Sequence, residues 1–151
     1  MIILDTDCLS LFDREKSLES SILRNRLSRF SPEDVLTTII TFEEQMRGWL
    51  TYLSKCKNIE EQIFAYERLN QFLDNFRKIV VVPFDEKAAE VFQQLKSQKI
   101  RVGTMDLKIA AIAISNNAIL ISRNLSDYEQ IPNLTVHDWT KQFFPTKKVS
   151  I

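Results

Sequence analysis

The chain has 151 residues, 44% of them hydrophobic and 26% charged, with only 2 Gly and 4 Pro, which predicts one globular domain able to bury its own core. Twenty basic residues balance 20 acidic ones, so no overall positive field attracts nucleic acid, although a bound metal would supply positive charge locally. Two cysteines are too few for a disulfide framework, no secretory signal opens the chain, and the longest apolar-rich run, residues 109–114, is too short to span a membrane, so we expect a soluble cytoplasmic protein.

The N-terminal segment predicts a strand followed by two helices. Residues 1–5 are a continuous apolar run that ends in an acid, which is typical of a buried parallel strand. Residues 6–10 can then cap and begin a helix. Apolar positions at helical spacing predict a second helix within residues 14–31, which ends near Ser31 and Pro32.

The next segment predicts a second strand and two further helices. Residues 35–40 are rich in β-branched side chains and are expected to form the strand. Thr41 is the expected N-cap of the helix that follows. Apolar residues at helical spacing between Asn58 and Lys78 predict a long amphipathic helix.

The remaining residues alternate between strand and helix patterns. Strands are expected within residues 79–83, 118–122 and 134–139, and helices within residues 85–99 and 105–117. Thr104 is a candidate N-cap for the second of these helices. The alternation predicts a single α/β domain over residues 1–151, with three layers (α/β/α) and a central, mostly parallel sheet of about five strands. The tail from about residue 145 is expected to be frayed.

Four acidic residues stand near the points where hydrophobic stretches end. Because the carboxyl ends of parallel strands meet at one edge of a sheet, these side chains are expected to converge there. Carboxylate clusters bind hard divalent cations such as Mg²⁺ or Mn²⁺, and such ions are commonly used to cut phosphodiesters. The four acids are Asp5, Glu44, Asp106 and Asp127, and Asn124 accompanies the last of them.

Each of these acids, taken alone, also has a purely structural interpretation. Asp5 can cap the helix that follows it, and Asp7 suits a turn or cap. Glu43 and Glu44 are adjacent in a helix and point to different faces, so only one of them can face a site. Asp106 is either a capping group or a ligand.

Four segments of the chain carry a family pattern: ILDTDCLS (3–10), T-x-x-E-Q-x-x-G (41–48), GTMDLKIAAIA (103–113) and ISRNLSDYEQIPNL (121–134). Taken in order, they resemble the PIN-domain ribonucleases and in particular VapC-type toxins of bacterial type II toxin–antitoxin modules. The similarity extends from residue 1 to about residue 139. In the last segment family members typically read T-R-N-x-x-D-F, whereas this chain has Ser122 in place of Thr and Tyr128 in place of Phe.

The resemblance implies a metal-dependent endoribonuclease. Its first and third acids fall on Asp5 and Asp106, and its second falls on Glu44 because the family acid lies four residues before a Gly. Together they would hold one Mg²⁺ or Mn²⁺, with Asp127 or Asn124 supporting a second ion. The metal would activate a water for in-line attack on the phosphodiester.

The same resemblance implies further contacts and partners. An RNA substrate, a cognate antitoxin on the helical hairpin of residues 49–78 and a homodimer are expected, with no membrane association. Thr41 and Ser122 are candidates for supporting the acids, and Arg47 and Arg101 are further candidates for RNA phosphate. The residues expected to contact substrate are Ser10, Thr104, Arg123 and Asn124.

Two other functions are compatible with parts of the sequence. A PIN-fold scaffold that binds RNA or protein without cutting is favoured by Asn124 in the fourth position of the site. A haloacid-dehalogenase-type phosphatase is favoured by the partial D-x-D match at Asp5 and Asp7. That phosphatase family also needs a later strand followed by G-D-x-x-x-D, and none follows residues 118–122.

Overall fold

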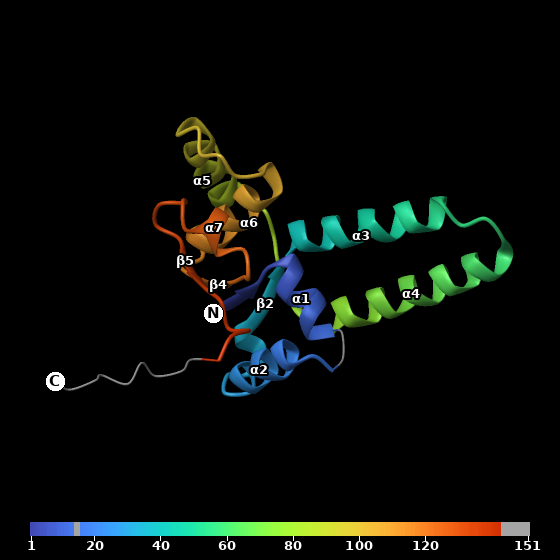
Figure 1. The fold of residues 1–151 in the computed structure, drawn as a ribbon. Coiled ribbons are helices and arrows are strands. Elements are labelled where there is room, and N and C mark those ends of the chain that lie inside the picture. Colours follow the sequence, from blue (N-terminus) through green and yellow to red (C-terminus); the bar gives the residue numbers. More distant parts are fainter. Residues whose placement is uncertain (14–15, 143–151) are drawn as a thin grey trace.

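Five parallel strands form the centre of the fold in a computed structural model that describes residues 1–13 and 16–142 (Figure 1). Their order in the sheet is β3-β2-β1-β4-β5. The first strand of the chain, β1, therefore lies in the middle of the sheet, and the last, β5, forms one edge. The predicted three-layer α/β fold is confirmed, and every strand pair is parallel. The predicted frayed tail lies outside the described residues. The strands are β1 (Ile2–Leu4), β2 (Val35–Thr38), β3 (Val80–Val82), β4 (Ile119–Ile121) and β5 (Thr135–His137).

Helices cover both faces of this sheet because the apolar strand residues alternate between the faces. Ile3 and Leu120 pack with helices α5 and α6, and Ile2, Leu4 and Ile121 pack with α1, α2 and α4. Each face therefore has its own core. The helices are α1 (Thr6–Asp13), α2 (Leu18–Leu27), α3 (Ile39–Ser54), α4 (Ile59–Arg77), α5 (Glu86–Ser97), α6 (Thr104–Ser115) and α7 (Leu125–Tyr128), with a 3₁₀ turn at Pro32–Asp34.

Two predicted helix starts differ from the structure. Strand β2 ends at Thr38, whose hydroxyl accepts from the Thr41 N–H at 3.1 Å, so Thr38 and not Thr41 caps α3. Gly103, and not Thr104, is the N-cap of α6. Helix α2 lies within the predicted residues 14–31. It begins at Leu18, where the Ser17 side chain caps it by accepting from the Ser20 N–H, and it ends at Leu27, before the predicted end near Ser31.

Helices α3 and α4 form a hairpin that extends away from the sheet (Figure 1). The predicted amphipathic helix of residues 58–78 is confirmed as α4, yet only part of its apolar face is covered. Phe72 and Phe76 lie in the core near the sheet, whereas Ile63 and Phe64 are exposed farther out. Across the described residues, no helix has both the length and the apolar character needed to cross a membrane.

Candidate active site at the carboxyl edge of the sheet

Asp5 occupies the centre of the site, directly after the middle strand β1. Its Oδ1 accepts from the Cys8 N–H at 2.8 Å, so the predicted capping role at α1 is real. Its Oδ2 accepts from the Ser122 hydroxyl at 2.5 Å. Ser122 follows the neighbouring strand β4, and its hydroxyl also accepts from the Asn124 N–H at 2.9 Å. Both carboxylate oxygens of a 5% exposed side chain are therefore fixed.

Glu44 reaches the site from helix α3. Its Oε1 accepts from the Thr6 hydroxyl at 2.8 Å, and Thr6 is the residue next to Asp5. The Thr6 hydroxyl also lies 3.3 Å from that of the buried Thr41, the hydroxyl expected to support the acids. The adjacent Glu43 instead pairs with Arg47 one helical turn away. The structure thus brings Glu44, and not Glu43, beside the first strand.

Asp106 stands in the first turn of α6 and meets a tyrosine from the other side of the site. Its Oδ1 accepts from the Tyr128 hydroxyl at 3.2 Å. Asp127 precedes that tyrosine on α7, and its Oδ2 accepts from the Asn124 side-chain amide at 3.0 Å. Asn124 and Asp127 therefore lie together at the fourth position of the site, after Asp5, Glu44 and Asp106.

The charges of these acids act on one another. Burial, opposed by the Ser122 and Cys8 hydrogen bonds, raises the pKa of Asp5 from 3.8 to about 6, and the charge of Asp7 adds to this increase. Burial and the charges of Asp106 and Glu43 raise the pKa of Glu44, against the hydrogen bond from Thr6. Burial and the charge of Asp127 raise the pKa of Asp106 in the same way. The charge of Asp106 thus disfavours the ionised form of Glu44, and the charge of Asp127 disfavours that of Asp106.

A divalent cation would relieve this repulsion. Among the described residues, the ion pairs involve Asp7, Glu19, Glu43, Asp74 and Asp138, and none involves the four acids of the site. Oxygen donors with uncompensated negative charge are the ligands that Mg²⁺ and Mn²⁺ prefer. Within residues 1–13 and 16–142, however, no three Asp, Glu, His or Cys side chains are already placed to hold one ion together. The chemistry of the donors fits a cation, and binding would require their side chains to move closer.

The structure gives Asp7 and Arg123 a shared role beside the site. The guanidinium of Arg123 donates to both oxygens of Asp7, at 2.6 and 2.5 Å, and to Glu19 at 2.6 Å. This arrangement ties the end of β4 to helices α1 and α2. Asp7 is thereby engaged as a structural partner, and the predicted phosphate contact of Arg123 would have to compete with two carboxylates.

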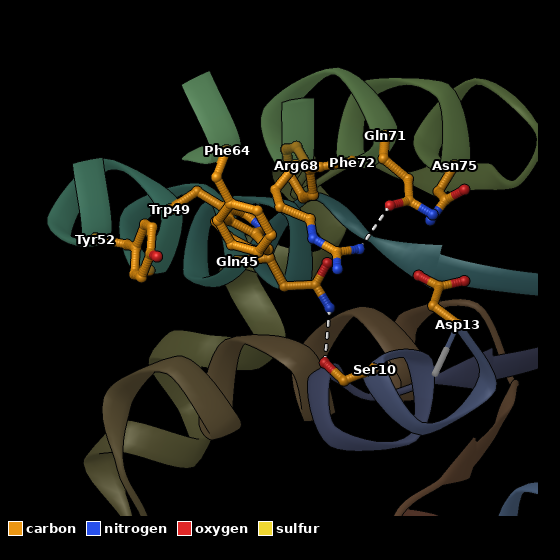
Figure 2. A pocket seen from close by; sticks show the side chains of 11 residues that line it. Ser10, Asp13, Gln45, Trp49, Tyr52, Phe64, Arg68, Gln71, Phe72 and Asn75 are labelled. Atoms are coloured by element: carbon orange, nitrogen blue, oxygen red, sulfur yellow. Dashed lines mark hydrogen bonds between the residues drawn. The ribbon is translucent and has the colours of Figure 1, made fainter. Parts of the chain in front are cut away.

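Two other predicted substrate-binding residues lie apart from the hydrogen bonds around the acids. Thr104 is exposed at the start of α6. Ser10 lies on α1 and accepts from the Gln45 side-chain amide at 3.0 Å. It borders a cleft of about 630 Å³ between α1 and the α3–α4 hairpin, with Trp49, Tyr52, Phe64 and Arg68 on the hairpin side (Figure 2).

Sequence reasoning did not find two residues of the site. The sequence pattern places Thr6 only at the start of a helix, whereas its hydroxyl donates to Glu44 in the structure. The family pattern has Phe at the position of Tyr128, and Phe lacks the hydroxyl that donates to Asp106 here. The position of Thr6 between a strand-end acid and a helix is the one signal that pointed to it. The contact of Tyr128 depends on the placement of α7.

The fold and the arrangement of acids define the class of the protein. The sequence profile of the PIN domain matches residues 2–132, and the chain belongs to the PIN domain family. It is similar to a ribonuclease VapC1 from Haemophilus influenzae, with 32% identity over 124 residues that cover 80% of this chain and 86% of that protein.

Solved structures show the same similarity. VapBC-1 from nontypeable Haemophilus influenzae has 28% identity and a TM-score of 0.66, over 93% of this chain and 100% of that one. FitAcB from Neisseria gonorrhoeae has 25% identity and a TM-score of 0.68, over 92% of this chain and 98% of that one. Membership of this family leaves the haloacid-dehalogenase interpretation without support.

Proposed function

We propose that this protein is a Mg²⁺- or Mn²⁺-dependent endoribonuclease and the toxin of a toxin–antitoxin pair. The observation that carries the proposal is the convergence of Asp5, Glu44 and Asp106 from three separate elements, with the pKa of each raised mainly by burial. The curated relatives are named ribonucleases, which is consistent with that site. Because RNA is the proposed substrate, we place the action of the protein in the cytoplasm.

Asp5, Glu44 and Asp106 would hold the first ion, with Asp127 or Asn124 supporting a second. A bound ion would supply Lewis-acid chemistry, activating a water and stabilising charge on the leaving oxygen. The surrounding hydroxyls position the acids: Ser122 fixes Asp5, and Thr6 fixes Glu44. Such outer contacts orient the donors before any ion arrives.

The proposed RNA contacts surround these acids. Thr104 is exposed in the same helical turn as Asp106, and Asn124 lies beside Asp127. Arg123 would attract phosphate by its charge, although Asp7 and Glu19 now neutralise it. Ser10, in the cleft, would contact only RNA that extends from the acids toward the hairpin.

We assign the α3–α4 hairpin to a cognate antitoxin. Its exposed side chains include Leu50, Tyr52, Ile63, Phe64 and Leu73, which is more apolar surface than a solvated hairpin needs. The VapBC-1 neighbour bears the name of the VapBC family of toxin–antitoxin systems, which is consistent with such a partner. A homodimer, expected from the family resemblance, is part of the same proposal.

The decisive assay is RNA cleavage by purified protein with Mn²⁺ and with EDTA. Cleavage should require Mn²⁺ and should be lost in Asp5→Asn and Asp106→Asn. Glu43→Gln is the matched control, since it neutralises an acid adjacent to Glu44 that pairs with Arg47 instead. Equal cleavage by wild type and the two Asn variants would contradict the proposal. RNA binding without cleavage would favour the scaffold function.

A further inference from the structure

Tyr128 brings a hydroxyl into the acid site on an otherwise apolar side chain. The residue ends the short helix α7 and is only 1% exposed. Its ring belongs to the core cluster that also contains Ile109 and Ile131. A ring held this way has little freedom to turn, so the position of its hydroxyl is set by the core.

The hydroxyl group has a specific partner in the site. It donates to Asp106 Oδ1 at 3.2 Å, across 22 residues of sequence. Burial, together with the nearby charges of Asp106, Asp5 and Glu44, raises the pKa of Tyr128, so the group is a neutral donor that lies close to three carboxylates. A carboxylate oxygen accepts two hydrogen bonds, so this contact leaves Asp106 with capacity to bind a cation.

We propose that Tyr128 is a positioning residue for Asp106. Its buried hydroxyl holds the ionised Asp106 carboxylate in the orientation in which it binds the metal. This inference rests on the proposed metal-dependent function and deepens it. Asp106 projects from the first turn of a helix whose N-cap is Gly103, and that cap makes no side-chain hydrogen bond. The fixed hydroxyl therefore supplies an orientation that the local helix start does not.

The test is Mn²⁺ binding by Tyr128→Phe, measured by calorimetry on the metal-free protein. Phe keeps the ring in the core and removes only the hydroxyl. We expect the dissociation constant for Mn²⁺ to rise about tenfold, which is the effect typical of losing a contact that orients a metal ligand. The control is Thr140→Val, which removes another buried hydroxyl that donates to a carboxylate, that of Asp138 at 2.6 Å, and should leave the constant unchanged.

A second readout does not depend on metal. In EDTA, Tyr128→Phe should lower the melting temperature by roughly 3–12 °C, as expected for one hydrogen bond to a charged group in a domain of this size. In an Asp106→Ala background the same substitution should cause no loss, because the hydroxyl then has no carboxylate partner. Equal losses in both backgrounds would show a packing effect and overturn the inference.

The outcomes separate the inference from the proposed function. Wild type that binds Mn²⁺ and Tyr128→Phe that binds it equally well or more tightly would overturn the positioning role while leaving the nuclease intact. Wild type that binds no Mn²⁺ and cuts no RNA would overturn the proposed function and the metal-dependent part of the inference with it. The melting experiment would still decide whether Tyr128 holds Asp106.

Discussion

The Ser122 hydroxyl donates to Asp5 Oδ2 at 2.5 Å, joining two side chains that are 117 residues apart in the chain. The contact exists because β1 and β4 are neighbouring parallel strands, with Leu4 opposite Ile121. Each strand is followed directly by one of the two residues. The order of strands in the sheet, rather than any local motif, thus produces the oriented carboxylate at the centre of the site.

Removing that hydroxyl should weaken metal binding. In Ser122→Ala, Asp5 loses a donor that stabilises its ionised form, and hydrogen bonds to charged groups contribute about 1.5–3 kcal/mol. We expect the dissociation constant for Mn²⁺ to rise about tenfold or more, as measured by calorimetry. Ser122→Thr retains the hydroxyl and should bind more tightly than Ser122→Ala. Unchanged affinity in Ser122→Ala would mean that Asp5 does not need this contact.

The stability of the metal-free protein should contain a contribution that falls as pH rises. The pKa of Asp5 is about 6 in the folded protein against 3.8 without the fold, so the folded form binds the proton more tightly. That contribution is fully present below about pH 4 and is lost as pH rises through about 6, with a total of roughly 3 kcal/mol. Asp5→Asn cannot titrate at this position and lacks the contribution.

The measurement is urea unfolding in EDTA at about pH 5 and about pH 7.5, for wild type and for Asp5→Asn. Raising the pH should cost wild type more stability than it costs the variant. Other carboxylates affect both proteins alike, so the difference between them isolates Asp5. Parallel pH dependence in the two proteins would show that burial does not raise the pKa of this group.

Asp7 should behave differently from Asp5, two residues earlier. It is half exposed in its pair with Arg123, and partly exposed ion pairs contribute at most about 1 kcal/mol. Asp7→Asn should therefore lose less than about 1 kcal/mol of stability and keep its Mn²⁺ binding. Loss of Mn²⁺ binding in this variant would move Asp7 from the structural group into the metal site.

The hairpin should control neutralisation by the antitoxin without affecting cleavage. Phe64 is 44% exposed beside the cleft, where it contacts Tyr52 and lies under the guanidinium of Arg68. Phe64→Glu should weaken binding of the antitoxin by about 2 kcal/mol, as for an aromatic residue central to an interface. Leu18→Glu places the same charge on an exposed apolar side chain of α2 and is the control.

The assay adds the proposed cognate antitoxin, as purified protein, to the cleavage reaction. Phe64→Glu should still cut RNA and should resist inhibition, whereas Leu18→Glu should be inhibited like wild type. Normal inhibition of Phe64→Glu would place the partner elsewhere on the toxin.

The sequence was a good guide wherever one local signal dominated. Continuous apolar runs identified β1, β3 and β4 because buried parallel strands have no polar face. The strand predicted over residues 35–40 is two residues too long at its end. Ile39 and Ile40 have β-branched side chains typical of strands, but they begin α3. The capping hydroxyl of Thr38 outweighs that preference.

The composition of the site followed from the sequence more readily than its contacts. Acids after parallel strands must approach one edge, which is why Asp5 and Asp127, which come after the neighbouring strands β1 and β4, could be grouped in advance. Asp106 follows helix α5 instead of a strand, so only the family resemblance grouped it with them. The bonds from Thr6 to Glu44 and from Tyr128 to Asp106 join residues that are 38 and 22 positions apart in the chain and lie on different helices. Their existence depends on how α3, α6 and α7 pack, and no spacing in the chain encodes that.

The most direct measurement is anomalous diffraction from crystals of the protein grown with Mn²⁺. The proposed site predicts an anomalous peak enclosed by carboxylate oxygens of Asp5, Glu44 and Asp106, and no such peak in crystals of Asp106→Asn. Wild-type crystals in which Mn²⁺ binds elsewhere while these three acids remain apart would contradict the metal-dependent nuclease site.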